Sequence, residues 1–443
     1  MLNKENAYAL IDKVLSYSSN YTMVSIIDNE EGLTRFANSE IHQNVQSSDT
    51  TIEITVSGNK REATVTTNLM DDESLKLAVK NAEENLLFVP EGELVIPELT
   101  FPLEICNTEY DATLESTYGI IDRARLIKEG VEALGTSYAA AGALSLEKTV
   151  MAMGNSRGIK RYSRLNTIKL SVVVTHESGS SGYAAKLANA ASDMNVALNF
   201  EAAYKKAKKG INPISIEPGS YTVILEPAAV AGLLMYMSIS GFSAKSVQTG
   251  RSCLTGKLGE RVFGENITIT DDITNDNTFP FYFDTEGYER KKVEIIKNGV
   301  ANQLIYDTKS AVHDGVETTG HSISSPSMGG IPLNIVMEAG NESFENMIKN
   351  SKKAILVTRF HYMNTVNPRQ ALLTALTRDG LYLVEDGEIK SGIKNMRFTE
   401  SMLEAFNNVT AISAERTKVP SLMGVSYVPA LKIENFHFTG KTE

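Results

Sequence analysis

An uncharged stretch of 18 residues, from Pro227 to Ala244, is the feature that most limits how this chain can fold. It follows a short β-branched run at Tyr221–Leu225 and contains two glycines and three serines. Its length approaches the roughly 20 apolar residues of a membrane helix. The proline at its start and Gly241 near its end are instead typical of a helix within a globular protein. We therefore expect a strand, a turn and a buried helix that starts at Pro227 and stops at Gly241, and no membrane segment.

The remaining patterns predict an α+β chain with three regions. Residues 1–90 combine helical patterns with alternating β-branched runs, which predicts an antiparallel sheet flanked by helices. A proline-containing connector leads to a central α+β region, residues 103–212. Residues 213–443 are rich in strands and predict a mixed, barrel-like domain. The predicted helices of the first two regions are Glu5–Ser16, Asp72–Leu86, Leu114–Leu134 and Val196–Lys209.

Two short segments predict hairpins. Gly154–Gly158 reads GNSRG and lies between two strand patterns, so its turn-forming residues predict that these strands pair. Asp386-Gly387 separates the β-rich Leu381–Glu385 from Glu388–Lys390. Asp-Gly is a strong signal for a two-residue turn, which predicts a second hairpin there.

Charge, cysteine content and the first residues indicate which kinds of protein this chain resembles. The net charge of -11 argues against nucleic-acid binding, which depends on Lys and Arg that neutralise phosphates. The densest basic run, Lys205–Lys209, ends a predicted helix, where cations favour the helix dipole. Cys106 and Cys253 are far apart and predict reduced thiols. The first residues show no basic and then apolar pattern, so we expect a cytoplasmic protein.

Several segments together resemble a known family. Downstream of the predicted helix come LTGKLGERV at Leu254–Val262, ITDD at Ile269–Asp272 and FDTEG at Phe283–Gly287. In this order they are similar to the carboxy-terminal half of the TldD/PmbA family, described as modulators of DNA gyrase and as metallopeptidase subunits. Three further segments resemble the family in the same order, so the resemblance extends over nearly the whole chain: Leu33–Gln43, Gly154–Gly158 and Leu376–Ile389.

The resemblance also identifies what this chain lacks. The metal-binding branch of the family carries HExxxH on the helix, and this pattern falls on Met235, Tyr236 and Ser240. The late cysteine of that branch has no counterpart here. Zinc prefers imidazole, thiolate or carboxylate ligands, so a thioether and a neutral hydroxyl do not replace them. The chain therefore resembles the PmbA-type or TldE-type subunit, and we expect it to hold no metal and no catalytic residue.

The family resemblance implies a role as well as a fold. It implies that the three regions intertwine, and that an HExxxH-bearing TldD-like partner supplies zinc and the general base for hydrolysis of unfolded peptides. This chain would complete the groove, and a peptide could add a strand to an exposed sheet edge. Two alternatives stay open: a homodimeric binding or regulatory protein without proteolysis, and a self-sufficient hydrolase with a site of another kind.

Other residues with possible chemistry have simpler interpretations. His176-Glu177 starts HESGSSG, where glycines and serines replace the second zinc ligand, so we expect a strand end. His313, His321 and His361 have spacings that match no compact metal site. Arg378 and Asp379 lie in a family-like segment, and the guanidinium there could hold a peptide carboxylate with two hydrogen bonds.

Overall fold

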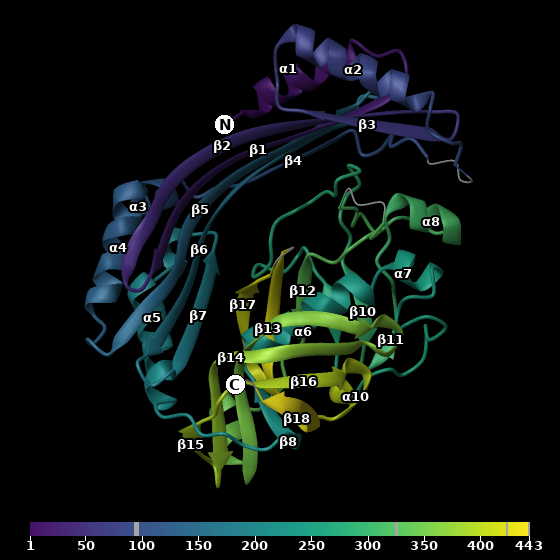
Figure 1. Ribbon diagram of the computed structural model, residues 1–443. Coiled ribbons are helices and arrows are strands. Elements are labelled where there is room, and N and C mark those ends of the chain that lie inside the picture. The colour runs from purple at the N-terminus through teal and green to yellow at the C-terminus, as the bar shows by residue number, and fades with distance from the viewer. Residues whose placement is uncertain (93–96, 324–326, 422–423, 442–443) are drawn as a thin grey trace.

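The computed structural model describes residues 1–92, 97–323, 327–421 and 424–441, and these build two β-sheets with helices around them (Figure 1). The first sheet is long and curved. Its strands are β1 (Tyr21–Ala37), β2 (Glu40–Gly58), β3 (Arg61–Thr67), β4 (Glu104–Glu109), β5 (Tyr138–Asn155), β6 (Lys160–His176) and β7 (Ser181–Ala188). They run in the order β3-β2-β1-β5-β6-β4, and β7 also pairs with β6. Only the pairing of β4 with β6 is parallel.

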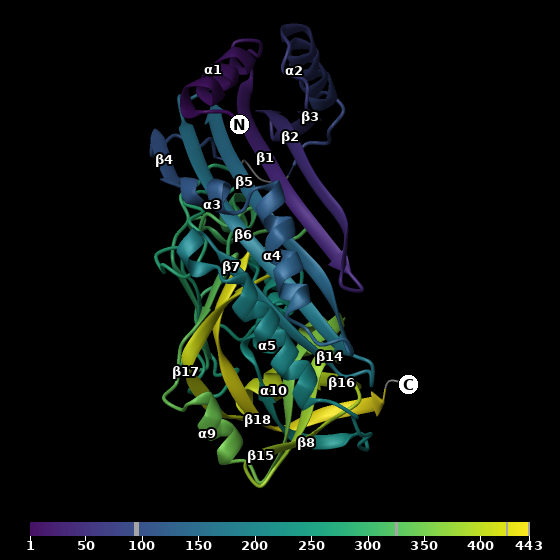
Figure 2. The same cartoon turned by 90° about the vertical axis from the view of Figure 1, so that its left-hand side faces the viewer.

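Helices cover the convex face of this first sheet (Figure 1). They are α1 (Lys4–Leu15), α2 (Asp72–Leu86), α3 (Ala112–Thr117), α4 (Ile120–Glu132) and α5 (Val196–Lys209). Because side chains alternate along a strand, only one face of each strand packs on them. Val24 and Ile26 of β1 are fully buried in a cluster with Ile11 of α1. The concave face of the first sheet faces the second sheet (Figure 1). In Figure 2, α4 and α5 lie in front of the strands of the first sheet.

The second sheet is mixed, and it holds eleven strands among the described residues. They are β8 (Gly219–Leu225), β9 (Ile269–Asp271), β10 (Val293–Lys297), β11 (Val300–Ala301), β12 (Asn334–Met337), β13 (Lys353–Asn367), β14 (Leu372–Glu385), β15 (Glu388–Gly392), β16 (Met396–Ser401), β17 (Val409–Pro420) and β18 (Val425–Lys441). The pairings of β12 with β18 and of β8 with β13 are parallel. Short helices surround them: α7 (Ala244–Gln248), α8 (Thr308–Asp314), α9 (Phe344–Lys349) and α10 (Met402–Asn407).

One long strand, β18, serves both parts of the second sheet. Its first half pairs with β12 and β17, and its second half pairs with β8 and β16. Its register against β8 shifts between Ile433 and Phe436, where Asn435 has a positive φ of 56°. Such a bulge bends a strand and changes its direction. The predicted α+β class and mixed sheet are confirmed, but the sheet as a whole is not closed as a barrel.

The predicted apolar helix is present as α6 (Pro227–Ser240). It starts with Pro227 at the first helical position and ends at Gly241, where a Cβ would lie 2.8 Å from the carbonyl oxygen of Met237. The helix packs against β13 and β18 inside the largest core of the molecule. No helix in the described part of the chain is long and apolar enough to cross a membrane.

Buried polar contacts join the two sheets. Arg161 of β6 is fully buried, and its Nε donates to the carbonyl oxygen of Gly287 at 2.7 Å. Ser181 of β7 donates to a carboxylate oxygen of Asp379 of β14 at 2.9 Å. Strands from the first two predicted regions pair in one sheet, since β1 pairs with β5. The domain limits at residues 90, 103 and 213 stay a prediction.

Most predicted local elements are confirmed. Asp72–Leu86 and Val196–Lys209 are helices with those bounds, and Gly154–Gly158 connects the paired β5 and β6. The prediction of one helix over Leu114–Leu134 is wrong, because α3 and α4 are separate. Tyr118 turns inward between them and donates its hydroxyl to the carbonyl oxygen of Met194 at 3.0 Å. Gly119, the residue after Tyr118, is not helical and precedes the first residue of α4.

Candidate functional site

The three positions that correspond to metal ligands are partly exposed on α6. Met235, Tyr236 and Ser240 are half-buried, whereas the neighbouring Leu233, Leu234 and Met237 are buried. The hydroxyl of Ser240 donates to the carbonyl oxygen of Tyr236 at 2.8 Å, one helical turn earlier. These positions therefore offer a thioether, a phenol and a hydroxyl that already has a partner.

A small cavity of about 10 Å³ adjoins α6. Met235, Ser238 and Ile239 line it from the helix, and Ile331–Leu333 line it from the segment before β12. Ser421, just after β17, and Val425, the first residue of β18, also line it. Its volume is no larger than that of one water molecule. Because thioether and hydroxyl groups are poor zinc donors and the lining is mainly aliphatic, these residues do not fit a zinc ion.

The acidic segments that resemble the family serve the fold. Asp271 is completely buried, and one of its oxygens accepts the backbone N–H groups of Leu333 and Asn334 at 2.7 and 3.0 Å. Its other oxygen lies 3.2 Å from Nε2 of the buried His321. Burial opposes ionisation of Asp271, but the charge of His321, with Arg290 and the backbone donors, holds its pKa below the ordinary value. Asp271 and His321 thus form a buried ionic contact that stabilises the fold.

The buried Asp284 and the half-buried Glu286 form a second acidic pair, in the turn that carries FDTEG. Asp284 accepts three backbone N–H groups, including that of Ser322 at 2.9 Å. Burial raises its pKa despite these donors. Burial, together with the charge of Asp284, raises the pKa of Glu286 to about 7. A carboxylate of Glu286 accepts the backbone N–H of Thr308 at 3.0 Å, which ties the turn to α8.

The histidines singled out from the sequence do not come together. His321 is buried, His313 is exposed and pairs with Asp314 at 2.8 Å, and His361 lies on β13. Burial and then the nearby Arg378 lower the pKa of His361. Within residues 1–92, 97–323, 327–421 and 424–441, no three His, Cys, Asp or Glu side chains are grouped as a metal site. His176 is the last residue of β6, so the predicted strand end is confirmed.

Arg378 and Asp379 have different surroundings. Asp379 is buried at a positive φ of 56°, accepts Nε of Arg359 at 2.8 Å and accepts the Ser181 hydroxyl. The Arg359 guanidinium also stacks on Tyr183, 4.0 Å from the ring centroid. Arg378 is about half exposed, with its Nε 3.9 Å from Asp379. The carboxylate is thus part of the contact between the two sheets, and the Arg378 guanidinium is the group that solvent reaches.

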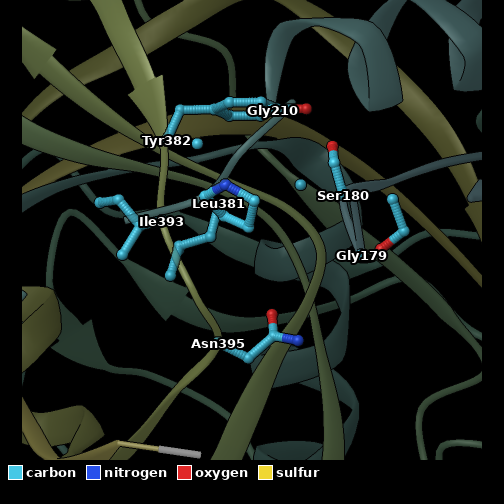
Figure 3. Close-up of a pocket in the computed structure, with 11 residues that line it drawn as sticks. Gly179, Ser180, Gly210, Leu381, Tyr382, Ile393 and Asn395 are labelled. Carbon is cyan, nitrogen blue, oxygen red and sulfur yellow. The ribbon is translucent and has the colours of Figure 1, made fainter. Parts of the chain in front are cut away.

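A cavity of about 30 Å³ lies close to this contact (Figure 3). It is lined by Gly179–Ser181 from the turn before β7, by Gly210 at the end of α5 and by Gly380–Tyr382 of β14. The Tyr382 hydroxyl donates to the carbonyl oxygen of Lys206 at 2.7 Å, and burial raises its pKa. The space suits one or two water molecules, so we interpret it as part of the packing between the sheets.

Comparisons with known proteins find two domains of one family in this chain, in the family's order. Residues 218–440 match the family model described as PmbA/TldA metallopeptidase C-terminal domain, and residues 23–86 match the model for domain 1. An uncharacterized protein of Methanocaldococcus jannaschii is 42% identical over 119 residues, 26% of this chain and 28% of its own length. A metalloprotease of Methanothermobacter thermautotrophicus is 24% identical over 220 residues, 48% of this chain and 47% of its own. Metalloprotease PmbA of Escherichia coli O157:H7 is 23% identical over 306 residues, 66% and 64% of the two chains. The chain spans less than two thirds of each of these curated relatives.

Solved structures share the fold over nearly the full length. TldE from Thermococcus kodakarensis superposes with a TM-score of 0.82 at 21% identity, covering 98% of this chain and 99% of that one. A Thermotoga maritima protein named for modulation of a DNA gyrase gives a TM-score of 0.81 at 21% identity, with the same coverage. At this identity the likeness shows the fold alone.

Proposed function

The chain belongs to the PmbA/TldD metallopeptidase family, and from this premise we propose that it is a metal-free subunit of a heteromeric peptidase. In this proposal a TldD-like partner that carries HExxxH holds the zinc and the general base. The present chain binds unfolded peptide and completes the groove. The cytoplasm is the proposed location, and neither nucleic acid nor a membrane is a proposed partner.

The side-chain chemistry of the three motif positions on α6 carries this proposal. Met235, Tyr236 and Ser240 occupy the three motif positions, and none of them is a ligand type that zinc prefers. The hydroxyl of Ser240 is already used within the helix, and Met235 joins an aliphatic lining. A chain with this surface can contact a peptide at the site, but the hydrolytic groups have to come from elsewhere.

Peptide binding through the main chain fits the strands next to this cavity. Among the described residues, β17 pairs with β18 from Arg416 to Pro420 and has no ladder with a second strand there, although β7 of the other sheet contacts it near Lys418. An extended peptide that adds to a strand edge gains backbone hydrogen bonds with little sequence preference. Such a mode suits unfolded substrates of varied sequence. The exposed Arg378 is a second candidate contact, for a carboxylate of the peptide.

Reconstitution tests the proposal. The purified chain, the purified HExxxH relative and their mixture are each incubated with an unfolded, fluorescently quenched peptide, and cleavage and zinc per chain are measured. We expect the mixture to cleave, and we expect cleavage to be lost when the partner's glutamate is replaced by glutamine. Replacing Met235 and Ser240 with alanine should leave the zinc content unchanged.

Each alternative predicts another pattern. Cleavage by this chain alone, lost on changing one of its own polar residues, would establish a self-sufficient hydrolase and overturn the proposal. Peptide binding by a homodimer, without cleavage in any combination, would establish a binding or regulatory protein.

A further inference from the structure

Lys418 of β17 lies where the edges of the two sheets meet. Its Nζ donates to the side-chain oxygen of Asn189, just after β7, at 3.0 Å. The same Nζ lies 5.6 Å from the centroid of the Phe279 ring. All three residues are half-buried, and β7 and β17 are in contact. The ammonium group of Lys418 thus contacts a neutral amide and an aromatic face. Among the described residues, no carboxylate oxygen lies within 4.0 Å of its Nζ.

Further positive charge surrounds this ammonium group. Burial and then the charge of Lys186 on β7 lower the pKa of Lys418 to about 8, while Asp193 acts in the opposite direction. Asp193 is exposed. Arg416 lies two residues before Lys418, so both side chains lie on the same face of β17. Its guanidinium stacks on Tyr427 at 4.4 Å. Lys186 is therefore a second cation near Lys418, and the carboxylate of Asp193 that opposes it is exposed.

Another half-buried lysine of this chain, Lys148, has the carboxylate partners that Lys418 lacks. Lys148 of β5 is also half-buried, and its Nζ contacts carboxylates of both Glu30 and Glu115, the second at 2.9 Å. With these partners the pKa of Lys148 is raised, although burial opposes the charge. Half-buried cations ordinarily have such partners, because removing a charge from water is expensive. The missing partner of Lys418 is therefore a reason to look for an anionic ligand.

The donors at the seam match the two oxygens of a carboxylate. An ammonium group has three N–H donors and Lys418 uses one of them on Asn189, whose amide nitrogen has two more. We propose that Lys418, Lys186 and Asn189 form a subsite that binds the terminal carboxylate of a peptide. This inference rests on the proposed function, because the carboxylate is that of the peptide substrate. Phe279 then gives the last residue of the peptide an apolar wall.

The position of the subsite relates it to α6. Ser421, which lines the small cavity beside Met235, follows Lys418 by three residues on the same strand and its end. At about 3.3 Å for each residue of a strand, the two places are roughly 10 Å apart. A peptide held by its carboxylate at Lys418 therefore places its last few residues next to the cavity beside Met235 of α6. The subunit would then select the end of the chain, and the partner would cut near it.

The experiment compares one short peptide, free of Asp and Glu, as its free acid and as its carboxy-terminal amide. Binding of both forms to the full chain, with the partner present, is measured by fluorescence anisotropy, and acetate and inorganic phosphate are added as competitors. One charge-assisted hydrogen bond predicts that the acid binds about tenfold more tightly than the amide. Acetate should reduce that preference, and a stronger effect of phosphate would assign the subsite to phosphate instead.

Matched variants separate the subsite from folding and from peptide binding in general. Lys418→Met should bind both forms with the affinity of the amide, and Lys418→Arg should keep the preference. Lys390→Met, on the exposed β15, should behave as wild type. Equal binding of acid and amide by the wild-type chain would overturn the subsite and leave the proposed function intact. No binding of either form would overturn the proposed function itself.

A second measurement does not depend on any variant. Reductive methylation with carbon-13 reports the titration of Lys418 by NMR in the unmodified sequence. The pKa should rise from about 8 when the free-acid peptide binds. An unchanged titration with bound acid peptide would contradict the proposal.

Discussion

Replacing Glu286 with glutamine should stabilise the protein above neutral pH and have little effect in acid. Burial raises the pKa of Glu286 from 4.5 to about 7. In the folded protein this carboxyl group therefore resists ionisation, whereas in the unfolded chain it ionises near 4.5. Stability from the protonated group is complete below pH 4.5 and is lost as the pH rises to 7. At about 1.4 kcal/mol per pKa unit, the loss amounts to about 3.5 kcal/mol at most.

The glutamine side chain keeps an acceptor for the backbone N–H of Thr308 and carries no charge. Urea denaturation should therefore show Glu286→Gln more stable than wild type by about 1 to 3 kcal/mol at pH 8, and within about 0.5 kcal/mol of it at pH 4. Glu289→Gln is the control, because Glu289 is exposed in the same turn. Its effect should not depend on pH. A gain of equal size at both pH values, or a loss at pH 8, would refute the argument from burial.

Other contacts make further predictions that thermal and urea denaturation can check. Asp379→Asn should destabilise the protein by about 3 kcal/mol, because it leaves the charge of Arg359 without its partner, whereas Arg378→Met should change stability by less than about 0.5 kcal/mol. Equal effects of the two variants would contradict this assignment. Gly142→Ala should destabilise the protein by about 3 kcal/mol, because the added Cβ would lie 2.1 Å from the carbonyl oxygen of Ser171. Wild-type stability of this variant would show instead that β5 and β6 can move apart to accommodate the methyl group.

Local sequence signals predicted the elements that depend on neighbouring residues. Pro227 and Gly241 gave both ends of α6, and Asp386-Gly387 connects β14 to β15 with both residues at positive φ, as a two-residue turn requires. The prediction failed at Leu114–Leu134, where Tyr118 turns toward Met194, a partner 76 residues away. Helical periodicity could not reveal that distant contact.

From the sequence, only those properties of the site that depend on residue type could be predicted. The absence of zinc ligands at Met235 and Ser240 is evident in this way, because neither side chain is a good zinc donor wherever it lies in the fold. Lys186 and Lys418 lie on different sheets, and only the contact between β7 and β17 brings them together. Likewise, no local pattern around Asp379 predicts that its carboxylate is buried at the contact between the sheets.

Native mass spectrometry of this chain, tagged and recovered from its own cells, tests the central claim most directly. The account predicts a mass equal to this chain plus an HExxxH-bearing relative and one zinc, with the zinc lost when the partner dissociates. Zinc retained by the isolated chain would contradict the claim that Met235, Tyr236 and Ser240 leave it without a metal site.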